Sequence, residues 1–178
     1  KVKSIIETVI AAGYTNFYVT GATLAEYSNG TAKTVVGEAI RQLETSTTFS
    51  IVLPDATSIG ESAFKECTAL TIVSLPAAET IGDYAFTRCT ALKSVSLPAA
   101  QTIGDGAFAF CIALTSVSLP TAETIGENAF NGCTALASVS LPVAIMIGNE
   151  AFAFCTALKS VSLPAATLIG KNAFYNCA

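Results

Sequence analysis

The side chains in this chain that could do chemistry are six cysteines, which recur every 22 residues: Cys67, Cys89, Cys111, Cys133, Cys155 and Cys177. Zinc sites use cysteines in closely spaced pairs, so an interval of this length is not typical of a metal site. Each cysteine stands three residues after a phenylalanine, and the first five precede an Ala-Leu pair, which indicates a small buried side chain rather than a ligand or a nucleophile.

Acidic side chains recur with the same period at Glu61, Asp83, Asp105 and Glu127. We interpret them as caps of short helices, in preference to paired acids of an enzyme or a weak cation site. One carboxylate per repeat is sparse for calcium, which takes about six to eight oxygen ligands. The chain has no histidine, so Ser-His-Asp and Cys-His catalysis is excluded. We expect no enzyme, no cofactor and no metal.

A sequence repeat positions these residues. Residues 76–97 read PAAETIGDYAFTRCTALKSVSL, and residues 98–119 read PAAQTIGDGAFAFCIALTSVSL. A fixed period of this length indicates a solenoid, in which each unit buries its apolar side against its neighbours. Phenylalanines recur with the same period as the cysteines, and we expect both sets of side chains to stack in the core as a ladder. These phenylalanines are Phe64, Phe86, Phe108, Phe130, Phe152 and Phe174.

Within one repeat, residues 92–97 alternate apolar and serine side chains, which predicts a short half-buried strand that ends at Pro98. Residues 105–111 place Ala, Phe and Cys at helical spacing, which predicts a short helix or 3₁₀ turn. Parallel strands lie about 4.8 Å apart and helices about 8–10 Å apart, so we expect an α/β horseshoe with concave strands and convex helices. On the wide convex side, equivalent cysteines should lie at or beyond the roughly 7 Å Cα limit of a disulfide, so we expect free thiols.

The repeat occupies residues 48–178 as six units of 22 residues, the last of them truncated. Residues 1–47 lack the period and predict an N-terminal cap, with a helix near residues 2–13, a strand at residues 16–20 and a second helix at residues 34–44. The repeats have no matching C-terminal cap. Either that cap was cut off, or the open end self-associates.

Composition limits the partners. The net charge is −4 and the chain has no cluster of basic residues, which argues against nucleic acid. The chain also lacks an uninterrupted run of about 18 apolar residues, so we expect no membrane insertion within it.

The unit I-G-x-x-A-F-x-x-C-x-x-L-x-x-V-x-L-P, as in residues 81–98, resembles the BspA-type leucine-rich repeat, also called the Treponema pallidum type. The resemblance covers about residues 50–178, with a unit one residue shorter than is usual in the family. It implies a right-handed solenoid with strands on its concave side. It also implies a secreted or cell-surface protein, mostly bacterial, that adheres to host matrix proteins or to other microbes.

Two surfaces are candidates for binding. The first is the outward side of the concave strands, which is either a solvated face filled by repeat copying or a hydroxyl-rich platform. It comprises Ser94, Ser96, Ser116, Ser118, Ser138, Ser140, Ser160 and Ser162, with Lys93 and Lys159 beside them. The second is a convex apolar patch of Phe110 and Phe154, which lie two repeats apart. The first strip lacks the Trp, Tyr and Arg that dominate most interfaces.

We therefore hypothesise a non-enzymatic repeat protein that binds a protein or glycan ligand, with host extracellular matrix among the candidates. The alternative from another class is a passive spacer that presents a further domain. An ice-binding surface on the Ser-x-Ser rows and a cryptic enzyme are remote readings.

Overall fold

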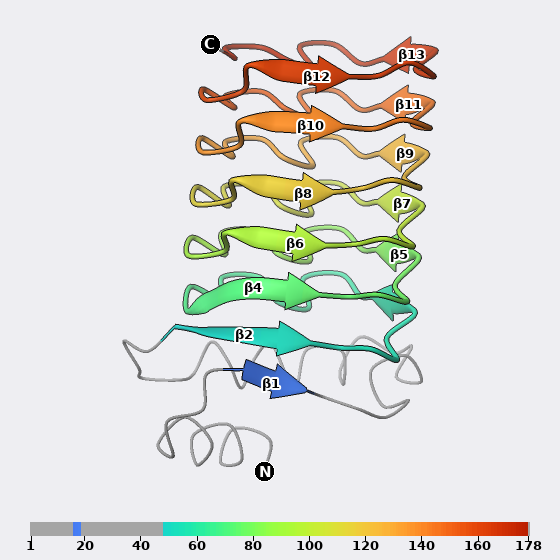
Figure 1. Ribbon diagram of the computed structural model, residues 1–178. Coiled ribbons are helices and arrows are strands. Elements are labelled where there is room, and N and C mark those ends of the chain that lie inside the picture. The colour runs from blue at the N-terminus through green and yellow to red at the C-terminus, as the bar shows by residue number, and fades with distance from the viewer. Residues whose placement is uncertain (1–15, 19–47, 178) are drawn as a thin grey trace.

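The structure is a computed structural model that describes the backbone of residues 16–18 and the whole of residues 48–177. These residues form a coil of parallel strands, a β-solenoid, in which each turn of the coil is one repeat (Figure 1). Followed upward from the N-terminus in Figure 1, the longer strands run from left to right on the near side and the short strands return on the far side, so the coil is right-handed.

Each repeat contributes one strand to each of two ladders. The longer strands, whose outer side we call the strand face, are β1 (Asn16–Tyr18), β2 (Phe49–Val52), β4 (Leu70–Ser74), β6 (Ser94–Ser96), β8 (Ser116–Ser118), β10 (Ser138–Ser140) and β12 (Ser160–Ser162). The second ladder consists of two-residue strands: β3 (Ser58–Ile59), β5 (Thr80–Ile81), β7 (Thr102–Ile103), β9 (Thr124–Ile125), β11 (Met146–Ile147) and β13 (Leu168–Ile169). All paired strands are parallel, and from β3 onward equivalent residues of successive repeats pair in register, as Val95 does with Val117.

The expected convex helices are wrong, because residues 48–177 contain turns and no helix. The segments expected to be helical form the third side of the coil, which we call the turn face. Alternate amides there bond to the next repeat instead of closing a helix: Phe64 N–H donates to the Ala85 carbonyl at 2.7 Å, and Glu66 N–H donates to the Thr87 carbonyl at 2.7 Å. The amides between them close tight turns, as Lys65 N–H does on the Ser62 carbonyl.

The expected horseshoe is corrected for the same reason. The turn-to-turn hydrogen bonds hold the turn face at a spacing close to the roughly 4.8 Å of parallel strands. The stacked phenylalanine rings of successive repeats accordingly lie only 5.1 to 5.4 Å apart between centroids. Because both sides of the coil have nearly the same spacing, the stack is nearly straight (Figure 1) and has no concave side.

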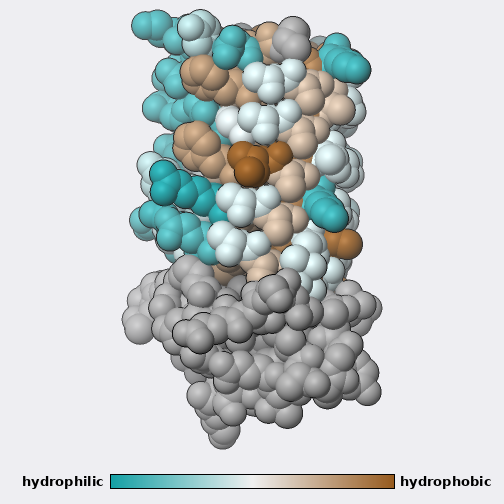
Figure 2. Space-filling view, turned by 90° about the vertical axis from the view of Figure 1, so that its left-hand side faces the viewer, coloured by the Kyte–Doolittle hydropathy of each residue, from teal (hydrophilic) through white to brown (hydrophobic). Residues whose placement is uncertain are grey.

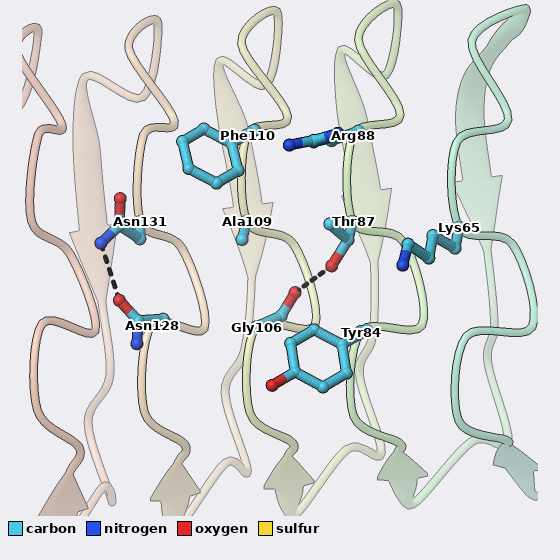
Figure 3. Close-up of a pocket in the computed structure, with 9 residues that line it drawn as sticks. All are labelled: Lys65, Tyr84, Thr87, Arg88, Gly106, Ala109, Phe110, Asn128 and Asn131. Atoms are coloured by element: carbon cyan, nitrogen blue, oxygen red, sulfur yellow. Dashed lines mark hydrogen bonds between the residues drawn. The ribbon is translucent and has the colours of Figure 1, made fainter.

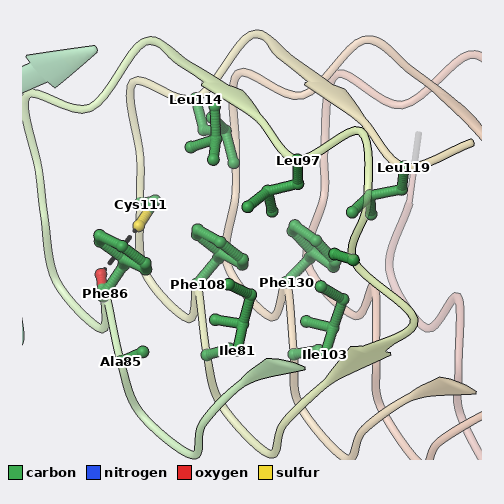
Figure 4. Close-up of a cluster of buried hydrophobic side chains, with 14 of the residues drawn as sticks. Ile81, Ala85, Phe86, Leu97, Ile103, Phe108, Cys111, Leu114, Leu119 and Phe130 are labelled. Carbon is green, nitrogen blue, oxygen red and sulfur yellow. Dashed lines mark hydrogen bonds between the residues drawn. The ribbon is translucent and has the colours of Figure 1, made fainter. Parts of the chain in front are cut away.

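The core is a stack of identical layers, each with one phenylalanine, one cysteine and several aliphatic side chains (Figure 4). Phe108 is fully buried, and its ring lies nearly parallel to those of Phe86 and Phe130. From Cys89 onward, each cysteine thiol donates to the carbonyl of a phenylalanine in the preceding repeat, as Cys111 Sγ does to Phe86 O at 3.1 Å. The phenylalanine–cysteine ladder therefore satisfies its own polar atoms.

The cysteines of residues 48–177 form no disulfide, but the reason differs from the expected one. The repeats are stacked at about 5 Å, within the roughly 4.4–6.8 Å Cα range of disulfides, so distance does not separate the cysteines. The side chains instead repeat the same orientation, and from Cys89 onward each thiol is directed at a carbonyl oxygen. Burial raises the pKa of Cys111 and Cys155 to about 12, and raises that of Cys89 and Cys133 as well.

The glycine that recurs before each acidic residue permits close contact between repeats. A Cβ built on Gly104 would lie 2.8 Å from Gly82 C and 2.5 Å from Asp83 Oδ1. Real Cβ atoms do not approach other atoms so closely, so a larger residue would push two repeats apart.

The strand expected at residues 16–20 is present as β1, which pairs in parallel with β2. The two helices expected in the N-terminal cap lie outside the described residues. At the other end of the stack, β12 and β13 each have an unpaired edge, and Leu168, Ile169 and Val161 are exposed there.

Candidate binding surfaces

The strand face presents the expected serine rows. Ser94 is half-buried, and Ser96, Ser116, Ser118, Ser138, Ser140, Ser160 and Ser162 are exposed, as are Lys93 and Lys159. Ser94 pairs with Ser116 and Ser96 with Ser118, and the serines of β10 and β12 pair in the same way. The rows are interrupted between β8 and β10, which are not joined in one sheet. The face is thus a ladder of small hydroxyls without an aromatic side chain in its rows.

The acidic row caps backbone amides, although not those of helices. Asp83 Oδ1 accepts from the N–H of Asp105 at 2.9 Å, and Asp105 Oδ1 accepts from the N–H of Glu127 at 2.8 Å. The two aspartates of the row therefore bond the same position of the next repeat, whereas Glu127 accepts from the Asn149 side chain at 3.4 Å. Among the described residues, no cluster of His, Cys, Asp and Glu could hold a metal ion.

The exposed aromatic side chains of residues 48–177 lie on the turn face, whereas exposed aliphatic ones such as Ile72 and Met146 lie on the strands. Tyr84, Arg88, Phe110, Phe154 and Tyr175 are all exposed there. In Figure 2, which faces the left-hand side of Figure 1, brown apolar side chains lie among white and teal polar ones above the grey segment. The turn face, rather than the strand face, therefore carries the residue types that dominate binding energies.

The backbone of the turn face is left-handed at two positions in every repeat. The first position comprises Ser62, Tyr84, Gly106, Asn128, Glu150 and Asn172, and the second comprises Glu66, Arg88, Phe110, Gly132, Phe154 and Asn176, with φ between 52° and 71°. Glycine and asparagine tolerate this conformation, whereas bulky side chains are strained in it by about 1–2 kcal/mol each. Four bulky side chains therefore occupy positions at which the backbone conformation favours glycine or asparagine: Tyr84, Arg88, Phe110 and Phe154.

The second left-handed position forms a continuous strip along the stack. Arg88 lies 3.9 Å from Glu66 as an exposed ion pair, and its guanidinium carbon lies 5.9 Å from the centre of the Phe110 ring. The Phe110 ring extends over Gly132, and a Cβ built on Gly132 would lie 2.8 Å from the Cδ1 atom of Phe110. Phe154 continues the strip and meets Tyr175 edge to face at 5.5 Å. Glu66, Arg88, Phe110, Phe154 and Tyr175 are called the turn-face strip below.

Sequence reasoning placed Tyr84 and Arg88 on the same side of the repeats as Phe110 and Phe154, but it included only the two phenylalanines in the candidate patch. The signal was available, because Gly106, Asn128, Gly132 and Asn172 share columns with them and mark left-handed backbone. Reading the segment as a helix concealed this pattern.

The repeats match a known family. The sequence model described as BspA type leucine rich repeat region matches residues 57–178 in six copies. None of the curated protein sequences is significantly similar to the chain. Within the described residues there is no helix long and apolar enough to cross a membrane.

Solved structures of similar chains come from bacteria. A leucine-rich repeat protein from Bacteroides ovatus is 33% identical with a TM-score of 0.67, over 72% of this chain and 37% of that one. A leucine rich cell surface protein from Faecalibacterium prausnitzii is 29% identical with a TM-score of 0.52, over 65% of this chain and 38% of that one. The leucine rich repeat protein of T. pallidum is 26% identical with a TM-score of 0.50, over 69% and 73% of the two chains. The chain thus spans less than two fifths of the first two proteins.

Proposed function

Because this chain belongs to the BspA-type leucine-rich repeat family, we propose that it is a non-enzymatic attachment protein at the cell surface or secreted from the cell. Its repeats act as a scaffold for protein interaction, and its ligand is a protein or a glycan, with host extracellular matrix proteins the first candidates. The F. prausnitzii relative, which is described as a cell surface protein, supports this location.

The observation that carries the proposal is the turn-face strip. Exposed Arg88, Phe110 and Phe154 stand in left-handed backbone that disfavours them, so folding stability does not account for their presence. Aromatic and arginine side chains supply most of the binding energy at protein interfaces. We therefore assign attachment to the turn face, and the serine rows of the strand face to solvated surface.

The competing function is a passive spacer that holds another domain away from the cell. The nearly straight stack suits a spacer. The strand face, whose serine rows contain no aromatic side chain, also supports this function. A spacer, however, has no use for large side chains in strained backbone, so the strip favours attachment.

The test is binding of the purified chain, by interferometry, to fibronectin, fibrinogen, collagen, laminin and mucin. Saturable binding that is lost in Phe110→Ser/Phe154→Ser, and kept in Ser96→Asp/Ser118→Asp/Ser140→Asp, supports attachment through the turn face. Loss only in the serine variant places the contact on the strand face instead. Absence of binding at tens of micromolar, with an unchanged circular dichroism spectrum, supports the spacer.

A further inference from the structure

The turn face contains a hollow of about 350 Å³ between the two left-handed columns (Figure 3). Tyr84 and Asn128 line one side of it, Arg88 and Phe110 line the other, and Lys65 and Asn131 lie at its ends. Ligand pockets begin at about 300 Å³, so the hollow has room for one small cyclic group and not for a folded peptide.

Two small residues of one repeat create the hollow. Gly106 and Ala109 are buried on its floor. The equivalent positions have larger side chains in both neighbouring repeats: Tyr84 and Thr87 in the preceding one, Asn128 and Asn131 in the following one. The Tyr84 ring reaches over Gly106, so that a Cβ there would meet its Cδ1 atom at 2.7 Å. The floor is closed by the Thr87 hydroxyl, which donates to the Gly106 carbonyl at 2.5 Å. The hollow is thus a feature of this repeat and not of the repeat in general.

Strained residues line the hollow. Tyr84, Arg88 and Phe110 have φ values of 56°, 59° and 59°, in columns where Gly106 and Gly132 show the unstrained choice. Bulky side chains that persist in such backbone are typical of functional sites. The rings of Tyr84 and Phe110 present flat apolar surface above the floor formed by Gly106 and Ala109.

The polar groups that line the hollow are mostly donors. Lys65 and Arg88 are its charged residues, and both are cationic in a chain of net charge −4. Glu66 lies behind Arg88 at 3.9 Å, with both side chains exposed, so water weakens that ion pair and a ligand carboxylate can replace it. Asn131 donates to Asn128 Oδ1 at 2.7 Å, which leaves its own amide oxygen for a ligand hydroxyl.

We propose that this hollow binds one carboxylate-bearing pyranose sugar at the end of a glycan. The apolar C–H face of the ring packs on Tyr84 and Phe110, the carboxylate meets Arg88 and Lys65, and the hydroxyls bond the amides of Asn128 and Asn131. The inference rests on the proposed attachment function and names a ligand class for the same face. Sialic acid and glucuronic acid are the two sources of this chemistry.

The test is isothermal titration of the intact chain with 3′-sialyllactose, a hyaluronan tetrasaccharide, neutral lactose and a tetraglutamate peptide. We expect one acidic saccharide to bind at least tenfold more tightly than lactose, and which one it is identifies the source. Arg88→Gln and Tyr84→Asn should each weaken that binding about tenfold. Ser140→Asn, which changes an exposed side chain of the strand face, should not change it.

Equal binding of lactose overturns the charge assignment, and full binding by both hollow variants overturns the site. Binding of tetraglutamate without either acidic saccharide replaces the sugar with an acidic peptide and so contradicts the proposal. If all four probes fail while a matrix protein still binds the turn-face strip, the sugar inference fails and the attachment function stands.

Discussion

Truncation of one ring in the middle of the phenylalanine ladder tests the stacked core. Phe108 is fully buried and lies between Phe86 and Phe130, at centroid distances of 5.1 and 5.2 Å. Phe108→Ala leaves a cavity and removes two ring contacts, and buried Phe→Ala changes cost about 3–5 kcal/mol. Phe174 is partly buried and contacts one ring of the ladder, Phe152, at 5.4 Å. Phe174→Ala should therefore cost about half as much, roughly 1.5–2.5 kcal/mol.

The assay is urea unfolding followed by circular dichroism, with Phe108→Leu as a control that keeps most of the side-chain volume and should cost less than about 1.5 kcal/mol. Repeat proteins also lose cooperativity when an interior interface weakens, so the Phe108→Ala transition should broaden. Equal losses for Phe108→Ala and Phe174→Ala would refute the stacked ladder, since an interior and a terminal ring would then have equivalent surroundings.

Three further predictions concern the thiols, the interior glycines and the left-handed columns. Burial raises the pKa of Cys111 and Cys155 to about 12, so the folded chain keeps protons that the unfolded chain releases above about pH 9. The contribution of each such thiol to the free energy of unfolding should therefore be constant below that pH and fall between about pH 9 and 12, by up to roughly 1.4 kcal/mol per pH unit. Urea titrations at several pH values measure this, and Cys111→Ala should make the fall shallower. Gly104→Ala forces a Cβ to within 2.5 Å of Asp83 Oδ1 and should lower stability by about 1–3 kcal/mol, and an unchanged unfolding midpoint would contradict the close packing of repeats. Phe110→Asn should leave stability unchanged or raise it by up to about 1 kcal/mol, because asparagine tolerates left-handed backbone, and a loss above 2 kcal/mol would mean that the ring is structural.

The repeat and the buried faces could be predicted because they depend on periodicity. Alternation in residues 92–97 gave the strand, and the in-step phenylalanines gave the core, since both follow from which side of the chain is apolar. The turn face could not be assigned in the same way. Residues 105–111 satisfy helical spacing, yet left-handed backbone at Gly106 and Phe110 sends alternate amides to the next repeat. Spacing alone does not report where a backbone hydrogen bond goes.

The stack is nearly straight because the turn face forms hydrogen bonds between repeats in place of the expected helices. The candidate site on that face arises from the same difference. Without convex helices both sides of the coil have strand-like spacing, and the side chains at the left-handed positions point out of the turns in two columns. Tyr84 and Arg88 were left out of the candidate patch because their surroundings include Gly106 and Phe110 of the next repeat, and the sequence of a single repeat does not show that contact.

The most direct test of attachment through the turn face is one variant measured in two ways. Arg88→Asn/Phe110→Asn/Phe154→Asn gives the strip the residue that Asn176 already provides in the same column. We expect its unfolding midpoint to equal or exceed that of the parent chain, while its binding to the matrix protein or mucin that the parent binds is lost. An unfolded or strongly destabilised variant, or one that binds as tightly as the parent, would contradict the claim that these side chains are held for a ligand.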